Sequence, residues 1–140
     1  MAQWTWQHDC SIPSECNAGR DVIDLMLTRL EQLNWTRRDL FSIRLATEEA
    51  VVNAVEHGNQ LDADKQVHIV CRISDDTAFI QITDEGPGFN PDAVPDPTDE
   101  DHLECPGGRG VMLMRNFMTK VDFNESGNQV TLLKKKSCSQ

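Results

Sequence analysis

The sequence predicts an α/β protein, a two-layer sandwich in which a mixed, mostly antiparallel sheet carries its helices on one face. Segments with apolar residues at every second position follow segments whose apolar residues recur every three or four positions, so strands and helices alternate along the chain. The strands come in pairs joined by short turns, which favours antiparallel pairing. The second face of the sheet is expected to stay apolar and exposed, which predicts a homodimer.

The chain of 140 residues has the size of one domain, and we expect a single domain over residues 1–140. Its 23 acidic residues outnumber the 13 basic ones, and the net charge of −10 disfavours binding to nucleic acid or to a membrane surface. Five cysteines without a CxxC pair indicate reduced thiols. The sequence has no signal-peptide pattern and no apolar run of about 18 residues, so a cytoplasmic protein is expected.

The N-terminal segment predicts a strand followed by a helix. Apolar and polar residues alternate from Trp4 onward, and the strand is expected to end at Pro13. Ser14 is expected to cap the first helix, because a serine side chain can accept a hydrogen bond from a free N–H group of the first turn. The apolar stripe of this helix ends near Asn34.

The second helix is expected to be long and to carry polar residues on one face. Thr36 is expected to cap it, and no Gly or Pro interrupts residues 37–57 before Gly58, where a helix ends. Glu49 and Asn53 lie one turn apart, so their side chains can enter one cavity. An amide oxygen suits Mg²⁺ and a carboxylate can act as a base, but a solvated helix face has the same pattern.

The second half of the chain predicts two hairpins separated by a long loop and a helix. Alternating residues over 67–73 and 78–83 predict the first hairpin. The segment from Asp84 to Gly110 holds five of the six prolines and five of the eight glycines, which indicates a long loop. A third helix, a closing hairpin and a frayed tail are expected over residues 110–118, 121–133 and 134–140.

Two glycine clusters border this loop. Asp84 continues the alternation of the strand before it, so its carboxylate faces the apolar layer and needs a donor, for example a ligand's amino group. Gly86 and Gly88 let the backbone pass close to a flat ligand, and Gly107-Gly108-Arg109-Gly110 opens a helix, where free N–H groups favour phosphate. An aspartate that caps its own turn is the alternative for Asp84.

Three motifs, in this order, resemble those of the GHKL ATPase superfamily, which has the histidine-kinase-like ATPase fold. The N box and the two glycine boxes correspond to EAVVNAVEHG at 49–58, DEGPG at 84–88 and GGRGVMLMR at 107–115. The resemblance covers roughly residues 12–134. Three ordered motifs are a specific signal, and the short single-domain form is similar to the anti-sigma factor serine/threonine kinases of bacterial partner-switching systems.

The resemblance implies a site for ATP and Mg²⁺. Asn53 would coordinate Mg²⁺, and Glu49 would be the catalytic base, in preference to Glu48, because the superfamily glutamate lies four residues before the asparagine. Asp84 would accept a hydrogen bond from the adenine amino group, and residues 92–110 would form an ATP lid. The other residues implied to bind the nucleotide are Gly86, Gly88, Gly107, Gly108, Arg109, Gly110 and Thr131.

The function that the resemblance implies is that of a MgATP-dependent serine/threonine protein kinase. Such a protein phosphorylates a small anti-anti-sigma protein of the STAS type and also sequesters a sigma factor. The alternative is a non-catalytic ATP-binding module that inhibits a partner by binding it. A sensor histidine kinase is disfavoured, because no helical segment with an acceptor histidine precedes the ATPase region.

Overall fold

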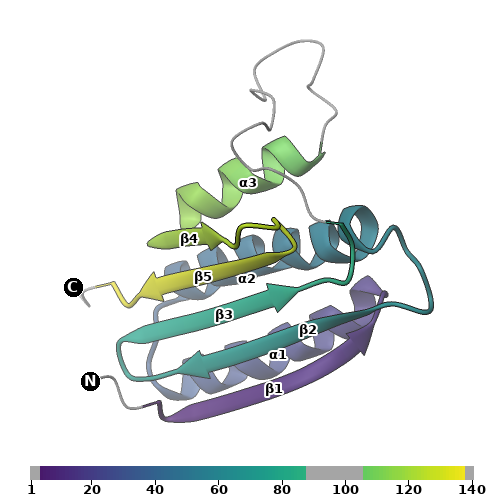
Figure 1. The fold of residues 1–140 in the computed structure, drawn as a ribbon. Coiled ribbons are helices and arrows are strands. Elements are labelled where there is room, and N and C mark those ends of the chain that lie inside the picture. Colours follow the sequence, from purple (N-terminus) through teal and green to yellow (C-terminus); the bar gives the residue numbers. More distant parts are fainter. Residues whose placement is uncertain (1–3, 88–105, 138–140) are drawn as a thin grey trace.

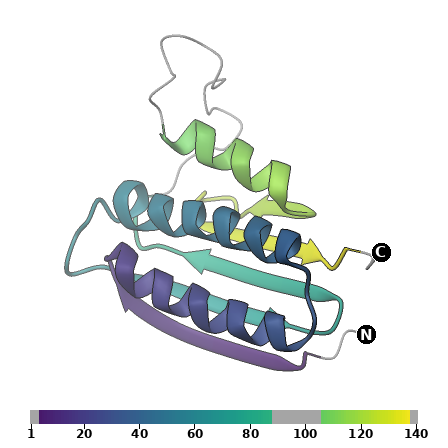
Figure 2. The same ribbon diagram turned by 180° about the vertical axis from the view of Figure 1, so that it is seen from behind.

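The computed structural model describes residues 4–87 and 106–137, which form a sheet with its helices on one face (Figure 1; Figure 2, from behind). Among these residues all four strand pairings are antiparallel, so the sheet is not mixed as predicted, whereas the two-layer α/β architecture is confirmed. No helix in the described ranges is both long and apolar enough to cross a membrane. In sheet order the strands are β1 (Trp6–Pro13), β2 (Gln66–Ile73), β3 (Thr77–Thr83), β5 (Gln129–Lys135) and β4 (Lys120–Phe123). In chain order the helices are α1 (Cys16–Gln32), α2 (Arg37–Val52), η1 (Asn53–Gly58) and α3 (Pro106–Phe117).

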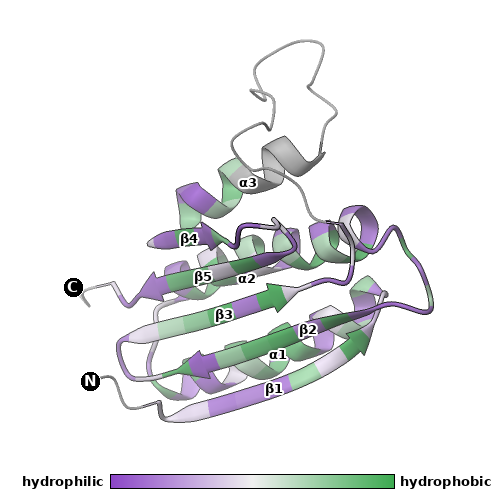
Figure 3. Cartoon of the chain, in the orientation of Figure 1, coloured by the Kyte–Doolittle hydropathy of each residue, from purple (hydrophilic) through white to green (hydrophobic). Residues whose placement is uncertain are grey.

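The core lies between the sheet and the helices. Alternate residues of β2 and β3 are buried there. Figure 3 shows that both strands carry hydrophobic residues. Gly19 on α1 allows the two long helices to approach each other, because a methyl group at this position would collide with the Val51 side chain of α2. The buried strand residues of β2 and β3 that face the helices are Val67, Ile69, Cys71, Ile73, Ala78, Ile80 and Ile82.

The second face of the sheet is largely polar. His68 of β2 lies 2.7 Å from the Asp9 carboxylate of β1. The guanidinium group of Arg72 covers the ring of Phe79 at 5.4 Å from its centroid. The large apolar side chains that the structure shows as exposed lie on the helices and after η1, not on this face, so the predicted reason for a homodimer is wrong; these residues are Leu25, Phe41, Leu61 and Met112.

The helix boundaries depart from the predictions at two points. Ser14 does not cap α1: its hydroxyl donates to the carbonyl of Lys65 at 2.8 Å, and Glu15 takes the N-cap position without a side-chain hydrogen bond. Thr36 caps α2 as predicted, because its Oγ1 accepts the N–H of Asp39 at 3.2 Å. The last turn predicted for this helix is π-helical and forms η1.

The C-terminal half follows the predicted order, with both hairpins confirmed. The helix α3 begins at Pro106, before the predicted residue 110, because proline is tolerated in a first turn, where its missing N–H group is not needed. The tail is not frayed over residues 134–137: β5 runs to Lys135, and the Ser137 N–H and hydroxyl donate to the Asp39 carboxylate at 2.8 and 2.6 Å. Asp39 is only 1% exposed and requires such donors. Residues 138–140 lie outside the described part.

Candidate functional site

The turn η1 brings the N box into direct contact with the first glycine box. It begins at Asn53 and ends at Gly58, and π-helical turns occur frequently at functional sites. A methyl group on Gly58 would collide with the Asp84 carboxyl group, and one on Gly86 would collide with the carbonyl of Gly58. Glycine is therefore required at both positions, and two motifs that are distant in the sequence form one wall of a site.

The Asp84 carboxylate is fixed in position, and one of its oxygens has no hydrogen-bond donor within residues 4–87 and 106–137. Its Oδ1 accepts the N–H of Gly86 at 2.8 Å, and no hydrogen bond from the described part of the chain reaches Oδ2. Burial raises the pKa of Asp84, while the Gly86 N–H and the charge of Lys65 partly oppose this shift. A ligand amino group at Oδ2 would supply the missing hydrogen bond. The alternative prediction, that Asp84 caps its own turn, is confirmed for Oδ1, which accepts the Gly86 N–H.

Asn128 anchors the backbone of Asp84. The Asp84 N–H donates to the Asn128 carbonyl at 2.9 Å, and the Asn128 side-chain amide donates to the Asp84 carbonyl at 3.1 Å. This residue, directly before β5, was not predicted as part of the site.

Thr131 does not reach this site. Its neighbours Val130 and Leu132 are buried toward the helices, so Thr131 points to the opposite face of the sheet, where its hydroxyl accepts from Gln81 at 3.2 Å. The predicted contact between Thr131 and adenine is therefore wrong. The alternation of residues 130–132 in the sequence is consistent with this orientation, whereas the adenine contact was implied only by the family resemblance.

Asn53 has a buried amide oxygen, and its Oδ1 has no hydrogen-bond partner among the described residues. A buried unpaired acceptor costs about 1–3 kcal/mol, and a cation would satisfy it. A hard oxygen ligand suits Mg²⁺. The described residues contain no group of three His, Cys, Asp or Glu side chains that could hold a metal, so Mg²⁺ would depend on Asn53 together with phosphate oxygens and water.

Glu49 lies one turn before Asn53, on α2. Its carboxylate is partly buried, and this burial is the main cause of its raised pKa. The negative charge of Glu48 raises the pKa further, and a carboxylate with a raised pKa is a stronger base. The Glu48 carboxylate itself lies 4.0 Å from the Arg20 guanidinium of α1, which supports the choice of Glu49 over Glu48.

The backbone of the second glycine box lies in the described structure. Gly107-Gly108-Arg109-Gly110 occupies the start of α3, where the first N–H groups of a helix have no partner within the helix. The helix α3 packs against α2 and η1, so this box lies on the helices that carry the N box. Gly88 and residues 92–105 of the predicted lid lie outside the described residues.

Asn59 is a second residue that the sequence analysis missed. It follows η1 directly and is completely buried. Its amide Nδ2 donates to the Ser14 hydroxyl and to the Gln66 carbonyl, both at 3.0 Å. Its Oδ1 accepts the N–H of Glu85 at 2.7 Å. An asparagine after a helix-ending glycine looks like part of an exposed turn, and only the fold reveals these partners.

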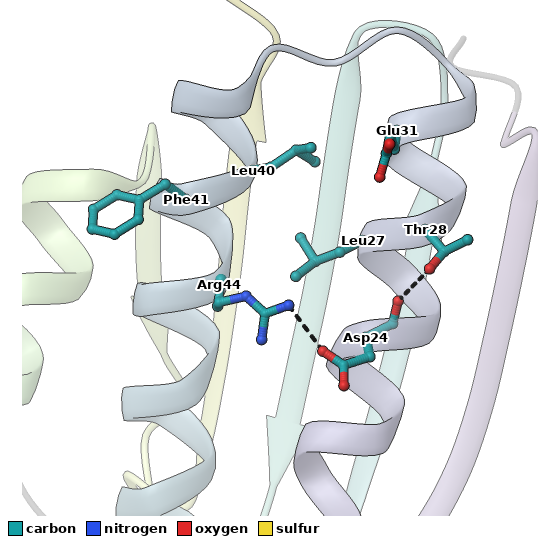
Figure 4. Close-up of a pocket in the computed structure, with 7 residues that line it drawn as sticks. All are labelled: Asp24, Leu27, Thr28, Glu31, Leu40, Phe41 and Arg44. Carbon is teal, nitrogen blue, oxygen red and sulfur yellow. Dashed lines mark hydrogen bonds and ion pairs between the residues drawn. The ribbon is translucent and has the colours of Figure 1, made fainter.

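A separate groove lies between α1 and α2 (Figure 4) and has a volume of about 390 Å³. Arg44 bonds to the Asp24 carboxylate at 2.9 Å across it, so these two charges compensate each other. None of the predicted nucleotide residues lines it. The lining residues are Asp24, Leu27, Thr28, Glu31, Leu40, Phe41 and Arg44.

Comparison with known proteins agrees with the three motifs. Residues 12–134 match the family described as histidine kinase-like ATPase domain. A protein named anti-sigma F factor from Oceanobacillus iheyensis is 33% identical over 117 residues, which cover 79% of this chain and 80% of that protein. A protein of the same name from Bacillus velezensis is 32% identical over 108 residues, which cover 75% of this chain and 73% of that protein. Another from Clostridium perfringens is 34% identical over 112 residues, which cover 76% of this chain and 79% of that protein. The chain therefore belongs to the histidine kinase-like ATPase domain family, as its N box and glycine boxes predict.

Proposed function

We propose that this protein is an ATP-dependent serine/threonine protein kinase and anti-sigma regulatory factor, which phosphorylates an anti-anti-sigma protein of the STAS type and sequesters a sigma factor. One observation carries the proposal: Gly58, at the end of η1, packs on Asp84, while Asn53 begins the same turn with a buried oxygen that no described residue pairs. The names of the relatives support a sigma factor as partner.

The ATPase family implies ATP binding, and the residues present fit that ligand. Asp84 Oδ2, which accepts no hydrogen bond from the described residues, would accept one from the adenine amino group. The unpaired oxygen of Asn53 would hold Mg²⁺, which neutralises phosphate charge when bound. Glu49 would orient the acceptor hydroxyl and take its proton. Phosphoryl transfer depends mainly on such positioning, so these three side chains account for the chemistry expected of this chain.

The charge of the chain fits the proposed partners. A net charge of −10 favours association with a basic protein, such as one that itself binds DNA. The place of action is proposed to be the cytoplasm, where ATP and a sigma factor are both present. A homodimer stays a prediction, without an apolar sheet face to support it.

The kinase proposal is tested by incubating the protein with radiolabelled MgATP and candidate partner proteins from the same genome. We expect labelled serine or threonine on one of them. Glu49→Ala should retain ATP binding and lose transfer, whereas Glu48→Ala, the matched control, should retain both. Transfer at the wild-type rate by Glu49→Ala would exclude Glu49 as the base.

The same experiment separates the alternative function. A non-catalytic module would bind ATP in an Asp84-dependent way and inhibit its partner, but would label no acceptor. In that case Glu49→Ala and the wild type would inhibit the partner equally. The family assignment would stand, but the kinase activity would not.

A further inference from the structure

Asn59 connects the segments that frame the proposed nucleotide site. Its side chain is 0% exposed and uses its two N–H groups and its oxygen in three hydrogen bonds. The partners belong to the turn before α1, to the first residue of β2 and to the loop after β3. They are the Ser14 hydroxyl, the Gln66 carbonyl and the Glu85 N–H.

These contacts determine where the backbone leaves β3. The Glu85 N–H belongs to the peptide that follows Asp84, so the bond to Asn59 at 2.7 Å fixes the peptide next to the Cα atom that carries the Asp84 side chain. The Glu85 carboxylate in turn accepts the N–H of Gln66, the residue that Asn59 also binds. The segment that carries Asp84 is therefore held to β2 by two connected contacts.

Asn59 also follows Gly58, whose backbone packs on the Asp84 carboxyl group. The position of Asp84 relative to η1 is thus set from both sides, by the packing at Gly58 and by the hydrogen bond at Glu85. An alanine at position 59 would leave the Glu85 N–H without its acceptor and remove one of the two constraints. Gly86, which donates to Asp84 Oδ1, would move with the same loop.

We propose that Asn59 is a positioning residue for purine selection: by holding the Glu85 peptide, it keeps Oδ2 of Asp84 where a 6-amino group of a bound purine can donate to it. The inference rests on the proposed function, in which Asp84 accepts from adenine. It predicts a loss of discrimination at the purine, separate from any general loss of nucleotide affinity.

The test compares MgATP with MgITP, which carries an oxygen in place of the 6-amino group. Calorimetry should show the wild type binding MgATP at least about tenfold more tightly than MgITP. Asn59→Ala should weaken MgATP binding and leave MgITP binding within about twofold, so that the two affinities converge. A purely structural role would lower both affinities by the same factor, because it would only reduce the folded fraction.

Ser74→Ala is the matched control. Ser74 is also buried and caps the turn at the opposite end of β3, where its hydroxyl donates to Asp76 at 2.9 Å and accepts the Thr77 N–H at 3.1 Å. This variant should lose stability and keep the wild-type ratio of the two affinities. A folded Asn59→Ala that also keeps this ratio would overturn the proposal.

Two further results decide the outcome where Asn59→Ala does not fold. In the wild-type protein without nucleotide, the Glu85 amide should exchange its hydrogen as slowly as the amides of β3, and exchange at the rate of an unprotected loop would overturn the proposal. A different result would show that the proposed function is wrong. A folded wild type that binds MgATP and MgITP equally would refute the adenine contact itself, and with it the role of Asn59.

Discussion

Asp84→Asn changes the hydrogen-bonding character of the proposed purine contact without changing its shape. The Gly86 N–H, 2.8 Å from Oδ1, needs an acceptor, so the amide oxygen is expected to occupy this position. The NH₂ group then occupies the position of Oδ2. It would face the amino group of adenine as a second donor, but it could donate to the oxygen at position 6 of inosine.

The magnitudes follow from the two hydrogen bonds exchanged. A bond from the adenine amino group to a charged carboxylate contributes about 1.5–3 kcal/mol, so its loss should weaken MgATP binding by about 10- to 150-fold. A neutral bond to the inosine oxygen contributes about 0.5–1.5 kcal/mol, so MgITP binding should strengthen by about 2- to 10-fold. The variant is therefore expected to bind MgATP about 10- to 150-fold more weakly than the wild type and to prefer MgITP.

Titration calorimetry with both nucleotides, together with thermal melts that verify folding, provides the measurement. Asp76→Asn is the control, because this exposed aspartate accepts the Ser74 and Thr77 hydroxyls in the turn at the other end of β3 and should leave both affinities unchanged. A folded Asp84→Asn with wild-type affinity for MgATP would refute the purine contact. Equal losses for both nucleotides would refute the orientation that the Gly86 N–H imposes.

Three other predictions concern the metal, the base and the tail. Asn53→Ala should weaken ATP binding in Mg²⁺ but not in EDTA, because only the metal-dependent affinity uses the unpaired amide oxygen; calorimetry in both buffers measures this difference. Glu49→Gln should raise the melting temperature at pH 7 but not at pH 3. Burial raises the folded-state pKa of Glu49, so the wild type loses stability relative to the variant as the pH rises through the folded-state pKa. Deletion of residues 137–140 should lower the free energy of unfolding by about 1–3 kcal/mol in urea titrations, because buried Asp39 loses the two donors of Ser137; an unchanged midpoint would contradict this account.

The local parts of the fold could be predicted from the sequence. Alternation over β2 and β3 and the cap at Thr36 depend on neighbouring residues, and both agree with the structure. Ser14 has the same capping chemistry as Thr36, but its hydroxyl binds Lys65, which is 51 positions away in the sequence. A residue type limits the possible partners, and only tertiary contacts select among them.

In the candidate site, too, local signals predict some residues and tertiary contacts decide the others. The motifs identified Asn53 and Asp84, because residue type and spacing determine what these side chains can bind. The roles of Asn59 and Asn128 depend on loops that meet only in the folded protein, and neither residue has a local signal. The π-helical form of η1 was also not predictable, because its six residues contain nothing that excludes a continued α-helix.

The contact between Gly58 and Gly86 has a consequence for regulation. Two backbones touch there without an intervening side chain, so no rotamer change can absorb a displacement of the helix that ends at Gly58. A protein that binds α2 and shifts it would change the affinity of the site for the purine. By thermodynamic reciprocity, an occupied purine pocket would change the affinity for that protein by the same factor.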